Sequence, residues 1–137
     1  MEGRALHILC VEDHRDTAEA VCKLLRDQGH TLTSVDSLKP AIEMIGLGDF
    51  DLLIADIGLP DGSGLDLVRH WRQHQPGKPS IAVTGYGMPH EVRSGMDAGF
   101  DHYLVKPIVF DQLLRVASAL PAGLHALPSA PAHRPSA

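Results

Sequence analysis

Short apolar segments alternate with longer amphipathic segments along most of this chain, and this alternation limits the possible folds more than any other feature. The apolar segments predict strands at residues 6–11, 31–35, 52–55, 81–84 and 103–105. Apolar residues at helical spacing predict one helix that ends near Gly29 and three more that span 40–47, 64–74 and 89–98. A last helix is predicted from its apolar face, which consists of Leu113, Leu114, Ala117 and Leu120.

Strands that are apolar along their whole length are typical of a parallel sheet with helices on both faces. Right-handed crossovers leave few topologies for five consecutive β-α pairs. We therefore predict the α/β class, with a doubly wound five-stranded parallel sheet in the strand order 2-1-3-4-5, which is flavodoxin-like.

The length of 137 residues fits one domain, which we predict to span 5–120. Residues 121–137 contain four prolines and no apolar period, which predicts a flexible C-terminal tail. No apolar stretch approaches the roughly 20 residues of a membrane-spanning helix, and the N-terminus lacks the features of a signal peptide. We therefore expect a cytoplasmic chain without a membrane segment.

The formal net charge of −5 argues against nonspecific binding to nucleic acid, because such binding depends on a basic surface. A protein partner is the better expectation. Cys10 and Cys22 lie in apolar segments without CxxC spacing, so we expect reduced thiols in the core.

Polar residues stand at the ends of four predicted strands: Glu12 and Asp13, Asp56, Thr84, and Lys106. In an open parallel sheet the carboxyl ends of the strands meet at one edge, and ligands bind in the crevice beyond that edge. Taken singly, each residue can be a turn former, a helix cap or a surface group. Together they predict a functional site.

Three carboxylates close together repel one another unless a cation lies among them. Oxygen ligands with room for water and phosphate suit Mg²⁺, whereas only His14 offers nitrogen nearby, which disfavours zinc. A carboxylate oxygen can attack phosphorus to form an aspartyl phosphate. Lys106 would place a positive charge beside the phosphoryl oxygens and Thr84 would donate a hydrogen bond to them. The residues therefore suit acceptance of a phosphoryl group.

Four sequence segments carry a resemblance to a known family: VEDH at 11–14, LLIADIGLPDGSG ending in Gly64, VTGYG at 83–87, and AGFDHYLVKP from Ala98 to Pro107. Over residues 5–120 the chain resembles the receiver domain of response regulators in two-component signal transduction, of the chemotaxis-response-regulator type. The resemblance implies that a histidine kinase or histidine phosphotransfer protein phosphorylates Asp56. It implies a phosphoprotein that catalyses its own phosphorylation and dephosphorylation and is not a turnover enzyme.

The resemblance also assigns roles to the remaining site residues. Asp13 and Asp56 would bind Mg²⁺ with the backbone carbonyl of Gly58, and Glu12 would act mainly through water. Thr84 and Lys106 would contact the phosphoryl group.

Signalling in the family is a population shift between two packings. Thr84 would move toward the phosphoryl oxygens while Tyr103 swings inward, although Tyr103 can also be an ordinary strand aromatic. This would change the face made by the helix at 89–98, the fifth strand and the last helix, where a downstream protein binds. The Lys106–Pro107 bond is expected to be cis, and a homodimer is compatible with the resemblance.

Gly58 stands where many relatives have a larger side chain, and Tyr86 follows Thr84 by two residues. Our hypothesis is that Gly58 leaves one side of the site open while Tyr86 shields the other. The chain is expected to be a stand-alone receiver or the C-terminal receiver of a hybrid histidine kinase.

Two alternatives stay open at this point. A phosphatase of the haloacid dehalogenase type also uses a strand-end aspartate and Mg²⁺, but it expects a DxD pair, and Asp56 is followed by Ile57 and Gly58. A flavodoxin-like electron carrier shares the strand order, but its first loop should be rich in Gly and hydroxyl groups, and here that loop reads EDHRD.

Overall fold

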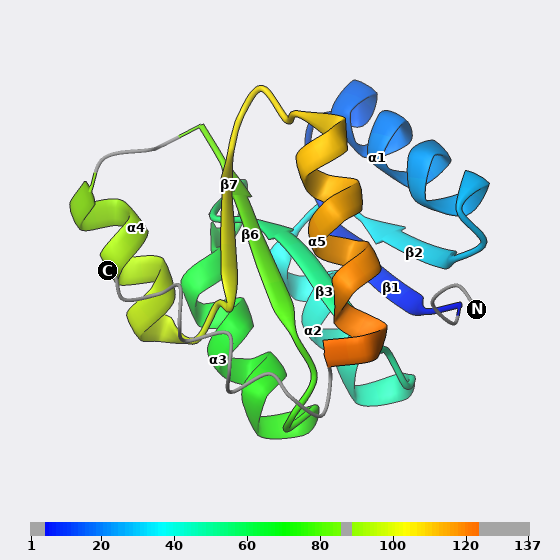
Figure 1. Ribbon diagram of the computed structural model, residues 1–137. Helices are drawn as coiled ribbons and strands as arrows, with labels where there is room; N and C mark the ends of the chain where they lie inside the picture. The colour runs from blue at the N-terminus through cyan, green and yellow to red at the C-terminus, as the bar shows by residue number, and fades with distance from the viewer. Residues whose placement is uncertain (1–4, 86–88, 124–137) are drawn as a thin grey trace.

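A computed structural model of the chain describes residues 5–85 and 89–123, with side chains over 5–85 and 93–117. Its main sheet is parallel and has five strands in the order β2-β1-β3-β6-β7, as Figure 1 shows. The strands of this sheet are β1 (His7–Val11), β2 (Thr31–Val35), β3 (Leu52–Asp56), β6 (Ser80–Thr84) and β7 (His102–Val105). The helices are α1 (Arg15–Asp27), α2 (Leu38–Leu47), α3 (Gly64–His74), α4 (Pro89–Ala98) and α5 (Phe110–Gly123).

The predicted order 2-1-3-4-5 is confirmed, because β6 and β7 are the fourth and fifth strands of this sheet. Predicted and observed element ends differ by one or two residues for most elements. Gly29 follows α1 with a φ of 99°, a left-handed conformation that favours glycine and ends the helix as expected.

One small element was not predicted. After β3, the two-residue strands β4 (Gly58–Leu59) and β5 (Gly62–Ser63) form an antiparallel pair in the loop that the sequence indicated as irregular. Leu59 is buried, so this pair packs the loop onto the domain.

Two apolar clusters lie on opposite faces of the sheet. Helices α1 and α5 cover one face, where Leu25 and Leu113 pack against β1 and β3, and Cys10 and Cys22 lie in the same cluster as free thiols. Helices α2, α3 and α4 cover the other face. The cluster on this face includes Trp71 of α3, which is fully buried. Both faces are therefore closed by helices, as a parallel sheet requires.

Burial differs between the middle and the edges of the sheet. Every residue of β3 and β6 is buried, whereas only Leu32 of β2 and Leu104 of β7 are buried. The middle strands are thus covered on both faces, as expected for a parallel sheet, whereas the edge strands are only partly covered. Edge strands have one neighbour and only partial cover, which permits polar side chains.

The last helix, α5, continues past residue 120, the predicted end of the domain, to Gly123. A tail was predicted for 121–137, and its residues from 124 onward lie outside the described part of the chain. The boundary between domain and tail therefore stays a prediction. Among the described residues, no helix combines the length and apolarity needed to cross a lipid bilayer.

Candidate functional site

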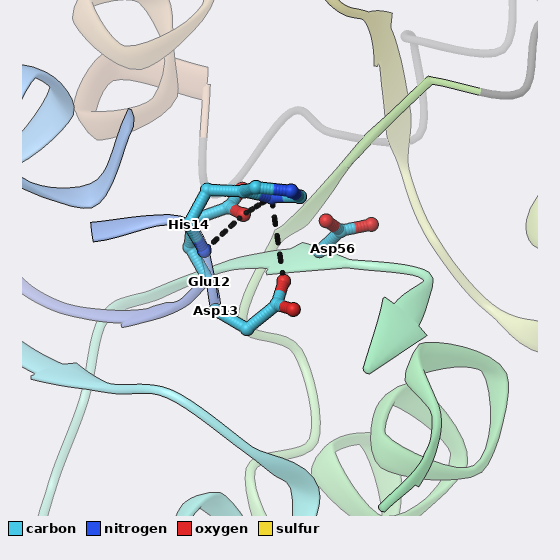
Figure 2. Close-up of side chains that lie close together, drawn as sticks. All are labelled: Glu12, Asp13, His14 and Asp56. Carbon is cyan, nitrogen blue, oxygen red and sulfur yellow. Dashed lines mark hydrogen bonds and ion pairs between the residues drawn. The ribbon is translucent and has the colours of Figure 1, made fainter. Parts of the chain in front are cut away.

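The carboxyl ends of the parallel strands meet at one edge of the sheet. Val11 lies beside Ala55, Asp56 beside Val83, and Thr84 beside Val105. This register places the acids that follow β1 next to the acid that ends β3. Figure 2 shows the resulting acidic cluster, which consists of Glu12, Asp13, His14 and Asp56. One ligand atom from each of these four side chains lies within 4.8 Å of the others.

Lys106 places a positive charge inside the acidic cluster. Its Nζ lies 3.0 Å from both carboxylate oxygens of Glu12 and 2.9 Å from Oδ2 of Asp56. Burial is deep here, because Glu12 and Asp56 are each 5% exposed. The predicted convergence of Glu12, Asp13, Asp56 and Lys106 is therefore present in the structure.

Burial raises the pKa of Asp56, and repulsion from Glu12 adds to this, although hydrogen bonds from Lys106 and Gly58 oppose it. Burial acts in the same direction on Glu12. Hydrogen bonds from His14 and Lys106 outweigh it, however, and lower the pKa of Glu12. Burial would lower the pKa of Lys106, but its bonds to Asp56 and Glu12 raise it. Lys106 is thus held in its charged form between two carboxylates.

The loop after β3 fixes the position of Asp56. The Gly58 N–H donates to Asp56 Oδ1 at 3.0 Å, and the Gly64 N–H donates to the carbonyl of Ile57 at 2.8 Å. A Cβ on Gly64 would collide with the carbonyl oxygen of Asp56 and lie 2.8 Å from the Cα of Ile57. Only glycine therefore lets α3 begin this close to the backbone of the acid.

The same loop is tied to α2 through Asp61. Its carboxylate accepts hydrogen bonds from the backbone N–H groups of Leu38, at 2.6 Å, and Lys39, at 3.0 Å. These groups have no partner within the helix because they lie in its first turn. Asp61 thus performs the capping role that Ser37, the residue before α2, does not perform with its side chain.

The two predicted switch residues occupy different places. Thr84 is fully buried at the end of β6, and its carbonyl accepts the N–H of Lys106 at 2.7 Å. Tyr103 is half-buried on β7, with its ring against Gly95 of α4. Thr84 is therefore adjacent to the acidic cluster, whereas Tyr103 lies against α4, the helix that covers this end of the sheet.

The peptide bond between Lys106 and Pro107 is cis, which confirms that expectation. Tyr86, expected to shield one side of the site, lies outside the described residues. The lifetime of an acyl phosphate and the effect of Gly58 on it stay predictions.

His14 is the member of the acidic cluster to which the sequence analysis assigned no role, although it was expected nearby. Its Nδ1 lies 2.9 Å from Glu12 Oε2 and 3.5 Å from Asp13 Oδ1, and its backbone N–H donates to Glu12 at 3.0 Å. The position of His14 directly after the two acids could have indicated its membership. The sequence, however, does not show whether the chain turns there so that the His14 ring faces the carboxylates. His14 is the N-terminal cap residue of α1, and this turn directs its ring over the carboxylates.

The donor atoms present fit a divalent metal ion. Three carboxylates and one imidazole surround a space that a single ammonium group partly neutralises. Carboxylate oxygens are the ligands that Mg²⁺ prefers, and the remaining negative charge favours a second cation.

The fold and the cluster together define a class: a doubly wound α/β domain with a carboxylate site at the switch point of its sheet. Residues 8–118 match the family described as the response regulator receiver domain. This chain belongs to that family.

The relatives that this chain matches in sequence include both transcriptional regulators and sensor kinases. The transcriptional regulatory protein CusR of Escherichia coli strain K12 is 38% identical over 120 residues, which are 86% of this chain and 52% of CusR. The sensor histidine kinase GacS of Pseudomonas protegens is 32% identical over 121 residues, which are 85% of this chain and 13% of GacS. This chain therefore spans about half of the one relative and a small part of the other.

Among solved structures, a CheY-like receiver domain protein from Methanospirillum hungatei JF-1 superposes with a TM-score of 0.84 at 25% sequence identity. The superposition covers 90% of this chain and 98% of that protein. The resemblance and the fold class drawn from the sequence are thus confirmed.

Proposed function

We propose that this chain is the phosphoacceptor of a two-component phosphorelay and that Asp56 takes the phosphoryl group. The observation that carries the proposal is the placement of a buried Asp56 carboxylate 2.9 Å from the Lys106 ammonium, beside Glu12 and Asp13 at the carboxyl edge of the sheet. This edge is where open parallel sheets bind ligands.

In the proposed reaction an Asp56 carboxylate oxygen forms a bond to phosphorus while the P–N bond of a phosphohistidine breaks and the imidazole leaves. Lys106 faces Asp56 directly and would contact the phosphoryl oxygens that arrive there. The Thr84 hydroxyl would donate a hydrogen bond to the same oxygens. Phosphoryl transfer depends mainly on positioning and charge neutralisation, and these residues would supply both.

Asp13, Asp56 and the backbone carbonyl of Gly58 would hold Mg²⁺, with Glu12 acting through water. When bound, the ion would neutralise the acids and the phosphoryl oxygens. Support for the Gly58 role comes from its position, since its N–H already donates to Asp56.

The phosphoryl donor is proposed to be a histidine kinase or a histidine phosphotransfer protein. Its histidine must reach Asp56, so the donor has to dock at the carboxyl edge of the sheet. A groove lies beside Lys106 between the start of α1, at Asp16 and Thr17, and the entry to α5, with Ile108 in the preceding loop and Phe110 as the first helical residue. Phe110 is exposed there, which offers apolar contact area next to the site.

The output is proposed to pass through the face made by α4, β7 and α5. Val105 is exposed on β7 and Tyr103 lies against α4, so a shift of Thr84 and Tyr103 would change a surface that a downstream protein contacts. Two copies of the chain could also associate. Matches to a transcriptional regulator and to a sensor kinase support both a regulator and a hybrid histidine kinase as the parent protein, and we place it in the cytoplasm.

We propose that the chain is not a turnover enzyme by itself. The alternative is a phosphatase of the haloacid dehalogenase type. In a DxD pair the second acid would stand at position 58, and here that position is Gly58. Gly58 pairs with Ser63 in the β4–β5 pair. Steady hydrolysis of p-nitrophenyl phosphate with Mg²⁺ would favour the phosphatase instead.

Intact mass after incubation with acetyl phosphate and Mg²⁺ tests the proposal. The native chain should gain roughly 80 Da, one phosphoryl group, and Asp56→Asn should gain nothing. Asp66→Asn is the matched control, because Asp66 is an exposed aspartate on α3 whose carboxylate pairs with Arg69. An equal gain in Asp56→Asn would place the phosphoryl group elsewhere and overturn the assignment.

A further inference from the structure

His14 belongs to the acidic cluster but has no part in the phosphoryl transfer described above. Its ring is 67% exposed, yet Nδ1 faces the carboxylates, as Figure 2 shows. Nδ1 lies 2.9 Å from Glu12 Oε2 and 3.5 Å from Asp13 Oδ1. The Lys106 Nζ lies 3.4 Å from the same nitrogen. The imidazole nitrogen is thus directed into the group formed by the carboxylate oxygens and the ammonium that they bind.

The spacing of these atoms matches one coordination sphere. Ligand atoms about 2.1 Å from an octahedral ion lie roughly 3 Å apart when adjacent and about 4.2 Å apart when opposite. In the acidic cluster all four ligand atoms lie within 4.8 Å of one another, and the two distances from Nδ1 fall near the adjacent value. Small side-chain adjustments would place the ligand atoms of Asp13, His14 and Asp56 around one ion, with Glu12 acting through water.

The alternative role for Nδ1 is a hydrogen bond that only orients Glu12. Lys106 already contacts both oxygens of Glu12 at 3.0 Å, and the His14 backbone N–H donates to Glu12 as well. Glu12 is therefore held by two other groups, and the ring is not required to orient it.

We propose that His14 is a ligand of the divalent metal ion and contributes its Nδ1 atom beside the carboxylates of Asp13 and Asp56. This inference rests on the proposed function, which includes the metal site. It adds a preference of that site for particular metal ions. An imidazole nitrogen binds later first-row ions such as Co²⁺ far more strongly than it binds Mg²⁺, because Mg²⁺ prefers oxygen ligands. His14 therefore shifts this receiver toward such ions relative to a site made only of oxygen.

Pulsed electron paramagnetic resonance of bound Mn²⁺ tests the coordination directly. The native chain should show the modulation of a directly bound ¹⁴N nucleus, and His14→Asn should lose it. Asparagine is a good N-terminal cap residue, so the variant keeps the start of α1. His74→Asn is the control, because His74 stacks on His70 at 4.1 Å on α3 and does not belong to the acidic cluster. That control should retain the modulation.

Calorimetric titration gives the second readout. The ratio of Co²⁺ affinity to Mg²⁺ affinity should fall about tenfold in His14→Asn and stay constant in His74→Asn. Absence of nitrogen modulation in the native chain, modulation that persists in His14→Asn, or an unchanged ratio would overturn the proposal.

Phosphorylation of the native chain by acetyl phosphate, followed by mass, separates this inference from the function it rests on. A mass gain without nitrogen modulation would overturn the role of His14 and leave the phosphoacceptor function in place. Nitrogen modulation that depends on His14 without a mass gain would support the ligand and overturn the function.

Discussion

At the scale of single residues, the position that would make Asp56 reactive is expected to lower the stability of the fold. The carboxylate is buried, its pKa is raised chiefly by that burial, and Glu12 repels it. Lys106 and the Gly58 N–H compensate only in part. Reactive groups held in unfavourable surroundings commonly lower the stability of a fold.

We predict that Asp56→Asn raises the free energy of unfolding by about 1 kcal/mol at pH 7 in the presence of a chelator, because a buried charge is removed. A raised pKa means that the folded state binds the Asp56 proton more tightly than the unfolded chain. The acid therefore favours folding most below its ordinary pKa of about 3.9, and this contribution is lost as the pH rises through the folded pKa.

The increase in the free energy of unfolding caused by Asp56→Asn should accordingly grow from pH 4 toward pH 7. Urea unfolding of both chains across this pH range measures it. A native chain that is more stable than the variant at pH 7 would show that the bond to Lys106 outweighs burial.

At the scale of elements, the contact between α4 and β7 connects the site to the surface. A Cβ on Gly95 would lie 2.9 and 3.2 Å from two ring carbons of Tyr103 and 3.5 Å from Cδ1 of Ile57. Ile57 directly follows Asp56, so the glycine in α4 lies next to both the proposed switch residue and the loop of the proposed phosphoacceptor. The absence of a side chain at Gly95 is what allows the Tyr103 ring to lie where it does.

We predict that Gly95→Ala moves the Tyr103 ring toward solvent with little change in stability. Alanine gains about 1 kcal/mol in helix propensity, and moving the half-buried ring out of its packed position costs a similar amount, about 1 kcal/mol. Fluorotyrosine labelling gives two ¹⁹F resonances, because the chain has two tyrosines, and Tyr103→Phe assigns them. The Tyr103 resonance should shift and become more sensitive to the solvent isotope.

Gly46→Ala is the matched control, since a Cβ there meets nothing within 4 Å and the substitution should only stabilise α2. An unchanged Tyr103 resonance together with a full gain in stability in Gly95→Ala would mean that α4 moves instead of the ring.

At the scale of the whole molecule, the acidic cluster draws on β1, β3 and the segment after β7, so ligand binding there is coupled to the global fold. A ligand that binds only the folded state stabilises it by mass action.

We predict that Mg²⁺ at one hundred times its dissociation constant raises the free energy of unfolding by about 2.7 kcal/mol. Asp13→Asn should lose most of this gain, whereas Asp66→Asn on α3 should keep it. The urea midpoint measured against Mg²⁺ concentration checks both expectations. A midpoint that does not respond to Mg²⁺, or that responds equally in Asp13→Asn, would contradict the metal site.

The sequence by itself determined the order of the elements and the residues that end the strands. Asp56 follows an apolar run too short for a helix and is therefore at the end of a buried strand. Parallel strands place their carboxyl ends on one edge, so the meeting of Asp13, Asp56 and Lys106 follows from the topology. Local pattern and sheet geometry are enough for these conclusions, because neither depends on how particular side chains pack.

Only the tertiary structure decided which atoms touch. Lys106 pairs with Glu12 across 94 residues of sequence and with Asp56 across 50, and Asp61 caps α2 across 23. His14 turns back over the carboxylates, Gly64 lies against the carbonyl of Asp56, and Gly95 makes room for Tyr103. These contacts depend on the final placement of backbones that lie far apart in the chain. A local pattern constrains each segment separately and does not specify distances between segments.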